Sequence, residues 1–335
     1  DQSPSHGGED AAQSFQRTIE LATKADGWVY HRYWVAEHHS SDRVMGSSPE
    51  VLISHLLAKT NRIRVGSGGV MLQHYSPYKV AENFNVLASL APGRVDLGIG
   101  RGPGGLPQST MALQQAVAGE RSISDKISEL REFLQGDLPE SHALHGLKAS
   151  PRPPESADIY LLGTSASSAE MAAEFALPYV FALFLNSDQD VMTKAMVDYH
   201  RLFDPAKITK KRAMLALPVV VAESEDEAAE LASKITVIRI SLESGRTLTT
   251  ATLKAAEDFG AQCGEKFEIN VYDAPVVYGS PELVLQKLLD IQRLHNVVEI
   301  MAVTAINDFQ KRLRSYELLS KVATEANMSG TLQGR

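Results

Sequence analysis

Cysteine is almost absent from this chain, because Cys263 is the only one among its 335 residues. A single cysteine cannot form an intrachain disulfide, and it supplies too few ligands for a zinc-finger pattern. Proteins without disulfides are typical of reducing compartments, so we expect a cytoplasmic location.

Long apolar runs and blocks of like charge are also missing. No stretch approaches the roughly 20 apolar residues that a transmembrane helix needs. The 33 Lys and Arg residues against 41 Asp and Glu give a net charge of -8, which is spread along the chain. We therefore expect neither a nucleic acid nor a membrane as a partner.

The sequence does contain a regular alternation of short β-branched runs with longer stretches of helical periodicity. Repeated strand–helix units indicate a parallel sheet. The expected strands are residues 32–36, 62–66, 94–99, 159–162, 179–183, 213–221 and 297–302. The expected helices are residues 11–24, 48–59, 77–90, 124–134, 167–175, 190–202, a helix from 225, and 308–324.

These units predict an α/β fold, a (β/α)8 TIM barrel formed as one domain by residues 1–335. Seven strands follow residue 30, and the helix at 11–24 needs an eighth before it, so we expect a truncated first strand at or before Asp1. Residues 239–273 fit no unit, are polar, and are expected to form a partly helical insertion near the barrel mouth. The alternative, an open doubly wound sheet, fits the strand count less well and lacks a good dinucleotide fingerprint.

The most informative motif is Tyr-Trp-Val-Ala-Glu-His-His at residues 33–39, an apolar strand that ends in three ionisable side chains. The carboxyl ends of parallel strands are where α/β proteins carry their chemistry. Histidine titrates close to neutral pH. Glu37, His38 and His39 are therefore candidates for proton transfer or for metal binding.

A shared metal ion is the weaker of these interpretations. Neighbouring residues on an extended segment point to opposite faces, so His38 and His39 would not easily bind one ion. The chain also has no HExxH motif, and we expect no metal. A third interpretation, that one or both histidines are only hydrogen-bonded inside the barrel, stays open.

A second cluster follows the fifth expected strand of the barrel and includes Gly163, Thr164, Ser165 and Ser168. Glycine lets a ligand approach the backbone, and a helix N-terminus offers hydroxyls, free N–H groups and the positive end of its dipole. This pattern is typical of a phosphate site. The alternative is an ordinary serine or threonine N-cap.

Glycines also cluster after two other expected strands. Arg101 lies among five glycines within residues 98–105, where its guanidinium is well suited to a ligand oxyanion. Gly68 and Gly69 follow the strand at 62–66 and would let a flat ligand lie against the main chain. The simpler interpretation of the second pair is a turn.

Several motifs in the same order make the chain resemble the bacterial-luciferase-like flavin monooxygenases. The likeness covers almost the whole chain. The matching segments are residues 33–39, 46–50, 64–72, 74–77, 92–102, 278–282 and 312–317.

The resemblance implies a (β/α)8 barrel that binds reduced FMN at its mouth, where O2 reacts to give a flavin hydroperoxide that oxidises an organic substrate. It implies that His38 is the catalytic histidine and that Glu37 belongs to the cofactor site. It implies phosphate contacts from Arg101, Ser165 and Ser168, together with Gly163 and Thr164 around them. Gly68 and Gly69 are implied to form an unusual, often cis, peptide beneath the flavin ring.

The chain has no good dinucleotide fingerprint, so we expect a separate NAD(P)H:flavin reductase as the source of reduced FMN. The resemblance also implies a homodimer. It leaves two alternatives open, a deazaflavin-dependent dehydrogenase on the same barrel and a flavin-binding protein without activity. The segment at 239–273 matches no family landmark, so we expect it to shape the pocket of an unidentified small substrate.

Overall fold

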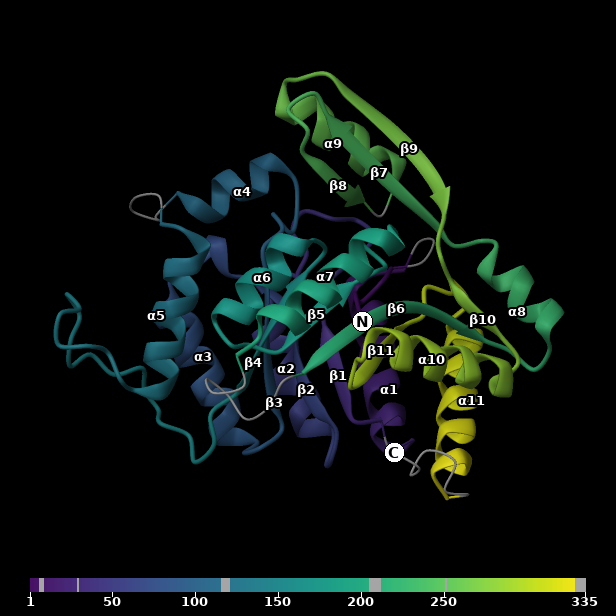
Figure 1. The fold of residues 1–335 in the computed structure, drawn as a ribbon, viewed down its shortest axis with the longest axis horizontal. Coiled ribbons are helices and arrows are strands. Elements are labelled where there is room, and N and C mark those ends of the chain that lie inside the picture. Colours follow the sequence, from purple (N-terminus) through teal and green to yellow (C-terminus); the bar gives the residue numbers. More distant parts are fainter. Residues whose placement is uncertain (6–8, 29, 116–120, 205–211, 251, 329–335) are drawn as a thin grey trace. The chain divides into compact units, whose positions relative to one another are not determined.

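The computed structural model describes residues 1–328 except 6–8, 29, 116–120, 205–211 and 251 (Figure 1). Two compact units are distinguished within it. The first unit comprises residues 1–23 and 31–162, and the second comprises residues 24–30 and 163–335.

The first unit contains four parallel strands in chain order, β1-β2-β3-β4. They alternate with helices, of which α2 and α3 pack against β2 and β3. All four residues of β1 and all six of β3 are buried, as expected for parallel strands covered on both faces. The elements are β1 (Arg32–Val35), α2 (Pro49–Lys59), β2 (Arg64–Met71), the 3-10 helix η1 (Leu72–His74), α3 (Pro77–Leu90), β3 (Val95–Gly100), α4 (Pro107–Gln114), α5 (Ile123–Gln135) and β4 (Asp158–Gly163).

The second unit is built around β6, all nine residues of which are buried. Strands β5, β10 and β11 all pair with β6 in parallel, and β10 pairs with the last three residues of β6. The parallel strands and their helices are α6 (Ala166–Glu174), β5 (Tyr179–Ala182), α7 (Gln189–Leu202), β6 (Ala213–Val221), α8 (Glu225–Ala232), β10 (Val277–Gly279), α10 (Pro281–His295), β11 (Glu299–Val303) and α11 (Phe309–Met328). Helix α1 (Ala11–Gly27) precedes them all and crosses from the first unit into the second.

The alternation of parallel strands and helices confirms the predicted α/β class, and all seven expected strands are present. The expectations of a single domain and of a closed barrel stay predictions. Asp1 lies beside β1, where its amino group donates to the Trp34 carbonyl and its own carbonyl accepts from the Ala36 N–H at 2.8 Å.

Three sequence expectations were wrong in detail. The strand expected at 62–66 runs to Met71, so Gly68 and Gly69 lie inside β2 instead of in a loop after it. A helix, α4, begins at Pro107, where the sequence analysis placed no helix, and proline suits the first turn of a helix. Strand β10 and helix α10 were also not expected.

The insertion differs from its prediction in both extent and structure. It begins at Thr236, and it forms an antiparallel sheet of order β8-β7-β9 with one helix. Figure 1 shows it projecting from the rest of its own unit. Its elements are β7 (Thr236–Leu242), β8 (Thr247–Thr250), α9 (Leu253–Cys263) and β9 (Phe267–Asp273).

Candidate active site

Glu37 is a buried carboxylate just beyond the end of β1, with 1% of its surface exposed. The Tyr75 hydroxyl donates to Oε1 at 2.7 Å, and the Met71 N–H donates to Oε2 at 3.0 Å. His39 Nε2 lies 2.8 Å from the same Oε1. Burial, and then the Glu37 charge, raise the pKa of Tyr75, which keeps its hydroxyl a donor. Glu37 therefore joins the ends of β1 and β2 to the segment after η1.

The two adjacent histidines lie in different surroundings. The His39 ring is hydrogen-bonded to Glu37. The His38 ring has no hydrogen bond from the described residues, although its backbone N–H donates to the Gly46 carbonyl at 2.7 Å. Burial, and then the neighbouring His39, lower the pKa of His38 to about 4. His38 is thus neutral at pH 7, and its catalytic role stays a prediction.

The Gly68–Gly69 peptide bond is cis, as predicted. A Cβ atom on Gly68 would lie 3.2 Å from the Trp34 side chain, and one on Gly69 would lie 2.7 Å from the Gly98 carbonyl oxygen. The first glycine therefore packs on the indole ring of β1, and the second packs on the backbone of β3. Gly69 needs glycine for its contact alone, whereas a methyl group at Gly68 would require a small shift of the Trp34 side chain. The role of both glycines beneath a flavin stays a prediction.

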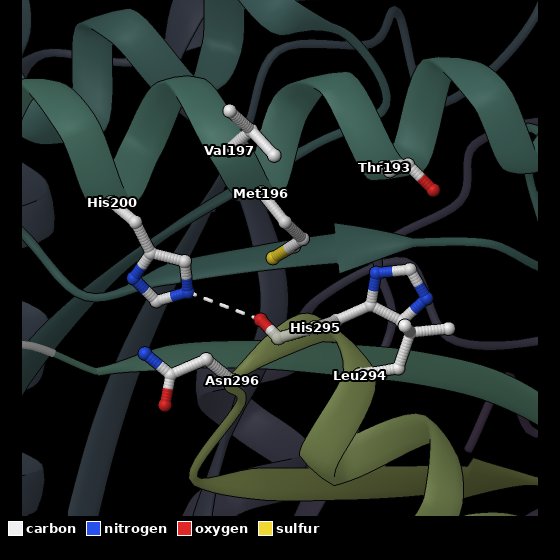
Figure 2. Close-up of a pocket in the computed structure, with 7 residues that line it drawn as sticks. All are labelled: Thr193, Met196, Val197, His200, Leu294, His295 and Asn296. Atoms are coloured by element: carbon white, nitrogen blue, oxygen red, sulfur yellow. Dashed lines mark hydrogen bonds between the residues drawn. The ribbon is translucent and has the colours of Figure 1, made fainter.

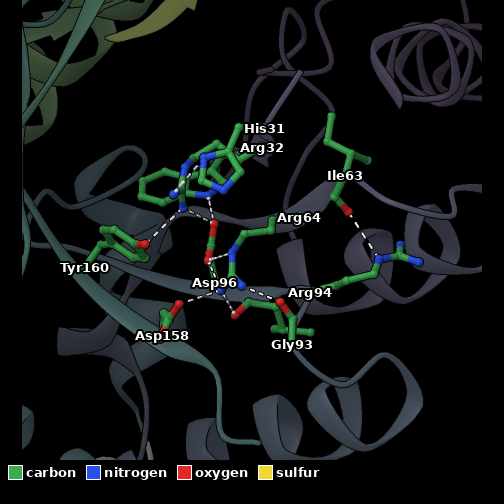
Figure 3. Close-up of polar contacts among 11 residues, drawn as sticks. His31, Arg32, Ile63, Arg64, Gly93, Arg94, Asp96, Asp158 and Tyr160 are labelled. Carbon is green, nitrogen blue, oxygen red and sulfur yellow. Dashed lines mark hydrogen bonds and ion pairs between the residues drawn. The ribbon is translucent and has the colours of Figure 1, made fainter. Parts of the chain in front are cut away.

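A charged cluster around Asp96 lies in the first unit, and the sequence analysis did not find it (Figure 3). Asp96 is fully buried in β3, and it accepts from Arg32 at 2.5 Å, from Trp34 Nε1 at 2.8 Å and from Arg64 at 2.6 Å. Arg32 also donates to the Tyr160 hydroxyl at 3.0 Å. An aspartate inside an apolar strand was the available signal, because aspartate is seldom fully buried without partners.

Arg101 directly follows β3 in the first unit and is half-buried. The first unit thus brings five predicted site residues to the carboxyl-terminal parts of β1, β2 and β3. These residues are Glu37, His38, Gly68, Gly69 and Arg101.

The second unit holds the other predicted residues in the turn from β4 into α6. Ser165 is the N-cap of α6, and Ser168 completes a capping box with it. Ser168 is fully buried, and its Oγ lies 2.9 Å from the Tyr179 hydroxyl. Gly163 is needed for this arrangement, because a Cβ atom there would lie 2.1 Å from Ser168 Oγ. The ordinary N-cap interpretation is therefore correct, and phosphate binding at this turn stays a prediction.

Two residues that were not among the predicted site residues also contribute here, Ser167 in this turn and Asn186 in the segment after β5. Ser167 is exposed, and its Oγ lies 3.0 Å from Ser165 Oγ, so two hydroxyls sit together at the start of α6. Asn186 donates its amide to the Thr164 carbonyl at 2.9 Å and accepts from Arg239 of β7 at 3.1 Å. These bonds connect the insertion to the turn. The convergence of this turn with the residues of the first unit stays a prediction.

Two other observations bear on the kind of site. No cluster of three or more His, Cys, Asp or Glu that could hold a metal ion occurs among the described residues. No helix in the part of the chain that the structure describes is long and apolar enough to cross a membrane.

Figure 2 shows a pocket between α7 and the end of α10 in the second unit. Val197 and Leu294 line it, and His200 Nε2 donates to the His295 carbonyl at 3.1 Å. None of the predicted site residues lines this pocket. We therefore place the candidate active site at the strand ends and not here.

Comparison with known proteins gives concordant matches over nearly the whole chain. Residues 2–295 match the family described as luciferase-like monooxygenase. The N-acetyl-S-alkylcysteine monooxygenase of Bacillus subtilis (strain 168) is 37% identical, and the match covers 97% of each chain. The crystal structure of apo-MsnO8 is 33% identical with a TM-score of 0.77, covering 96% of this chain and 95% of that one.

A more distant structure shares the fold. It is the oxygenating constituent of the 3,6-diketocamphane monooxygenase from the CAM plasmid of Pseudomonas putida, a type II Baeyer–Villiger monooxygenase in complex with FMN. It is 20% identical with a TM-score of 0.69, covering 94% of this chain and 93% of that one.

Proposed function

Because the chain belongs to the luciferase-like monooxygenase family, we propose that it uses reduced FMN and O2 to oxidise a small organic substrate, with His38 as its acid–base residue. The observation that carries the proposal is the position of His38 just after β1, where its backbone is fixed by the Gly46 carbonyl. The His38 ring is neutral at pH 7, and it has no hydrogen bond from the described residues. An imidazole at the carboxyl end of a barrel strand, with its ring nitrogens available, can exchange a proton with a reacting species.

The donor groups present are those that FMN needs. Arg101 supplies a permanent positive charge, and the first turn of α6 supplies N–H groups that have no acceptor within the helix. The hydroxyls of Ser165 and Ser167 add donors at the same turn. Each group suits a phosphate, and the Gly68–Gly69 peptide offers a surface without side chains to a flat ring. When bound, the reduced flavin supplies the electrons that activate O2.

Glu37 has an indirect part in this proposal. It holds His39 and Tyr75 by hydrogen bonds, and it fixes the main chain at Met71. The backbone of His38 is fixed separately, through Gly46. The protein therefore sets the position of the His38 ring through the neighbours of His38, while the ring nitrogens stay available for the reaction.

The test is substrate-dependent O2 consumption by the protein supplied with chemically reduced FMN. N-Acetyl-S-alkylcysteines are the first substrates to try, because the relative at 37% identity is named for them. We expect His38→Ala to lower turnover about 100-fold or more, as for a lost proton-transfer residue. His55→Ala, on the exposed side of α2, is the matched control and should leave turnover unchanged.

Two outcomes would contradict the proposal. Unchanged turnover in His38→Ala would remove the acid–base role. Tight binding of a deazaflavin, with hydride transfer and no use of O2, would replace the monooxygenase with a dehydrogenase.

The proposal includes the supply of the cofactor and the state of the protein in the cell. A separate NAD(P)H:flavin reductase would deliver reduced FMN, the protein would act as a homodimer, and it would work in the cytoplasm. Oxygen uptake in a coupled assay with a flavin reductase and NADH tests the supply. Sedimentation of the purified protein tests the dimer.

A further inference from the structure

The loop that carries Arg101 is held by three consecutive carbonyl groups. Gln73 Nε2 donates to the Gly102 carbonyl. His74 Nε2 donates to the Pro103 carbonyl at 2.9 Å, and the His39 N–H donates to the Gly104 carbonyl at 2.7 Å. Since successive peptide planes are fixed, little rotational freedom remains in the backbone immediately after Arg101.

His74 is the most constrained of these donors. It is 2% exposed, and its Nδ1 lies 3.1 Å from the Gln114 amide of α4. With the proton on Nε2, both ring nitrogens are satisfied in the neutral form. Burial lowers the pKa of His74, which favours that form.

The short helix η1, which bears Gln73 and His74, is itself held by a side chain of α5. Lys126 of α5 is buried, and its ammonium group donates to the Gln73 carbonyl at 2.8 Å and to the Tyr75 carbonyl at 3.2 Å. The T-shaped contact between the His39 and His74 rings, 6.1 Å between centroids, adds a further support. The residues that donate to the loop are therefore themselves held in place.

The backbone before Arg101 is equally well fixed. Gly100 is the last residue of β3, and it is in register with Met71 of β2. Arg101 thus lies between the sheet ladder on one side and the held carbonyls of Gly102 and Pro103 on the other. Its side chain must leave the backbone in a direction that these two attachments define.

We infer that His74 is a positioning residue for Arg101, holding the loop so that the guanidinium meets the phosphate of the flavin cofactor. The inference rests on the proposed function, because it takes FMN as the ligand. It adds a role for a residue that touches neither the flavin nor the substrate. It predicts that His74 affects the binding of the phosphate group and not that of the flavin ring.

The experiment compares FMN with riboflavin, which lacks the phosphate, by fluorescence titration of the purified protein. We expect Arg101→Ala to raise the Kd for FMN about tenfold or more, through loss of a charge-assisted hydrogen bond, with little change for riboflavin. We expect His74→Leu to raise the Kd for FMN several-fold, with riboflavin unchanged. His74→Gln, which keeps a donor close to the position of Nε2, should restore most of the affinity for FMN.

The double variant Arg101→Ala/His74→Leu separates positioning from general damage. If His74 acts through Arg101, His74→Leu has no further effect on FMN binding once Arg101 is removed. His145→Leu is the matched control, because His145 Nδ1 also bonds a carbonyl, that of Leu138, at 3.0 Å in a different loop. Its FMN affinity should equal that of the parent protein. Should His74→Leu not fold, Gln73→Ala tests the same loop from a half-buried residue.

The possible failures are distinguishable. An FMN preference over riboflavin that survives Arg101→Ala would overturn the phosphate assignment and, with it, this inference. If Arg101→Ala weakens FMN binding but neither His74→Leu nor Gln73→Ala does, the positioning role alone would be overturned. The positioning role would also be overturned if the losses of FMN affinity in the two single variants add up in the double variant.

Discussion

The indole N–H of Trp34 donates to the buried carboxylate of Asp96 at 2.8 Å, and the same side chain packs against Gly68. One carboxylate therefore orients the ring on which the Gly68–Gly69 peptide rests. The charged cluster around Asp96 and the glycines of the candidate site are therefore joined through Trp34.

Removal of Asp96 should destabilise the protein strongly. Asp96→Ala would remove the carboxylate that pairs with the Arg32 guanidinium, whose side chain is 2% exposed. Breaking a buried pair in this way typically costs about 3–5 kcal/mol. The free energy of unfolding in urea measures the loss. Asp158→Ala is the matched control, because Asp158 also pairs with Arg64 but its side chain is 54% exposed, and its cost should stay below about 1 kcal/mol.

Alanine scanning of the glycines should follow the steric order that the structure gives. Gly69→Ala places a methyl group 2.7 Å from a backbone oxygen, which cannot move without shifting β3. Gly68→Ala meets the Trp34 side chain at 3.2 Å, so it should cost less, within the ~1–3 kcal/mol typical of overpacking. Gly102→Ala meets nothing within 4 Å and should be nearly neutral. Thermal unfolding of the three variants gives the order, and equal losses at Gly69 and Gly102 would refute this steric account.

The two serines of the α6 cap should separate cleanly in their effects on stability. Ser168→Ala removes the buried hydroxyl that donates to the Ser165 carbonyl at 2.6 Å and contacts Tyr179, so about 1–2 kcal/mol of stability should be lost. Ser167→Ala changes an exposed hydroxyl and should stay within about 0.5 kcal/mol of the parent. Chemical denaturation of both variants makes the comparison. A neutral Ser168→Ala would show that its hydroxyl is not part of the cap in solution.

His38 should make stability depend on pH in the acidic range. Its pKa is lowered from 6.5 to about 4 in the folded protein, so the unfolded chain binds the proton more readily. The stability that comes from the neutral ring is fully present above pH 6.5, and it is lost progressively as the pH falls to about 4. Unfolding free energies across this range should fall more steeply in the parent than in His38→Gln. Parallel curves would show that His38 titrates normally.

The sequence was sufficient for the parallel strands, because strands such as β6 are continuous apolar runs with turn residues at their ends. The end of β2 was predicted wrongly because all four residues from 66 to 69 are glycine or serine, which normally indicate a turn. In the structure β2 keeps them, since β1 and β3 approach too closely for larger side chains.

The insertion was harder to predict for a different reason. Its strands β7 and β9 are half exposed, contain charged residues such as Arg239 and Glu268, and pair across 24 residues that include a helix. No short hairpin signal links them. The partners of Glu37 were also beyond sequence reasoning, because Met71 and Tyr75 lie 34 and 38 residues away and only the fold brings them close.

Thr236 and Asp273, the first and last residues of the insertion's sheet, are cross-strand partners. The two ends of the insertion therefore lie side by side, and this spacing does not depend on the length of the segment between them. Such a segment can be lengthened, shortened or exchanged without altering the spacing of the strands that flank it. The corresponding segment of a relative can therefore be grafted at this point, and a changed substrate range in the graft would test our prediction that the insertion shapes the substrate pocket.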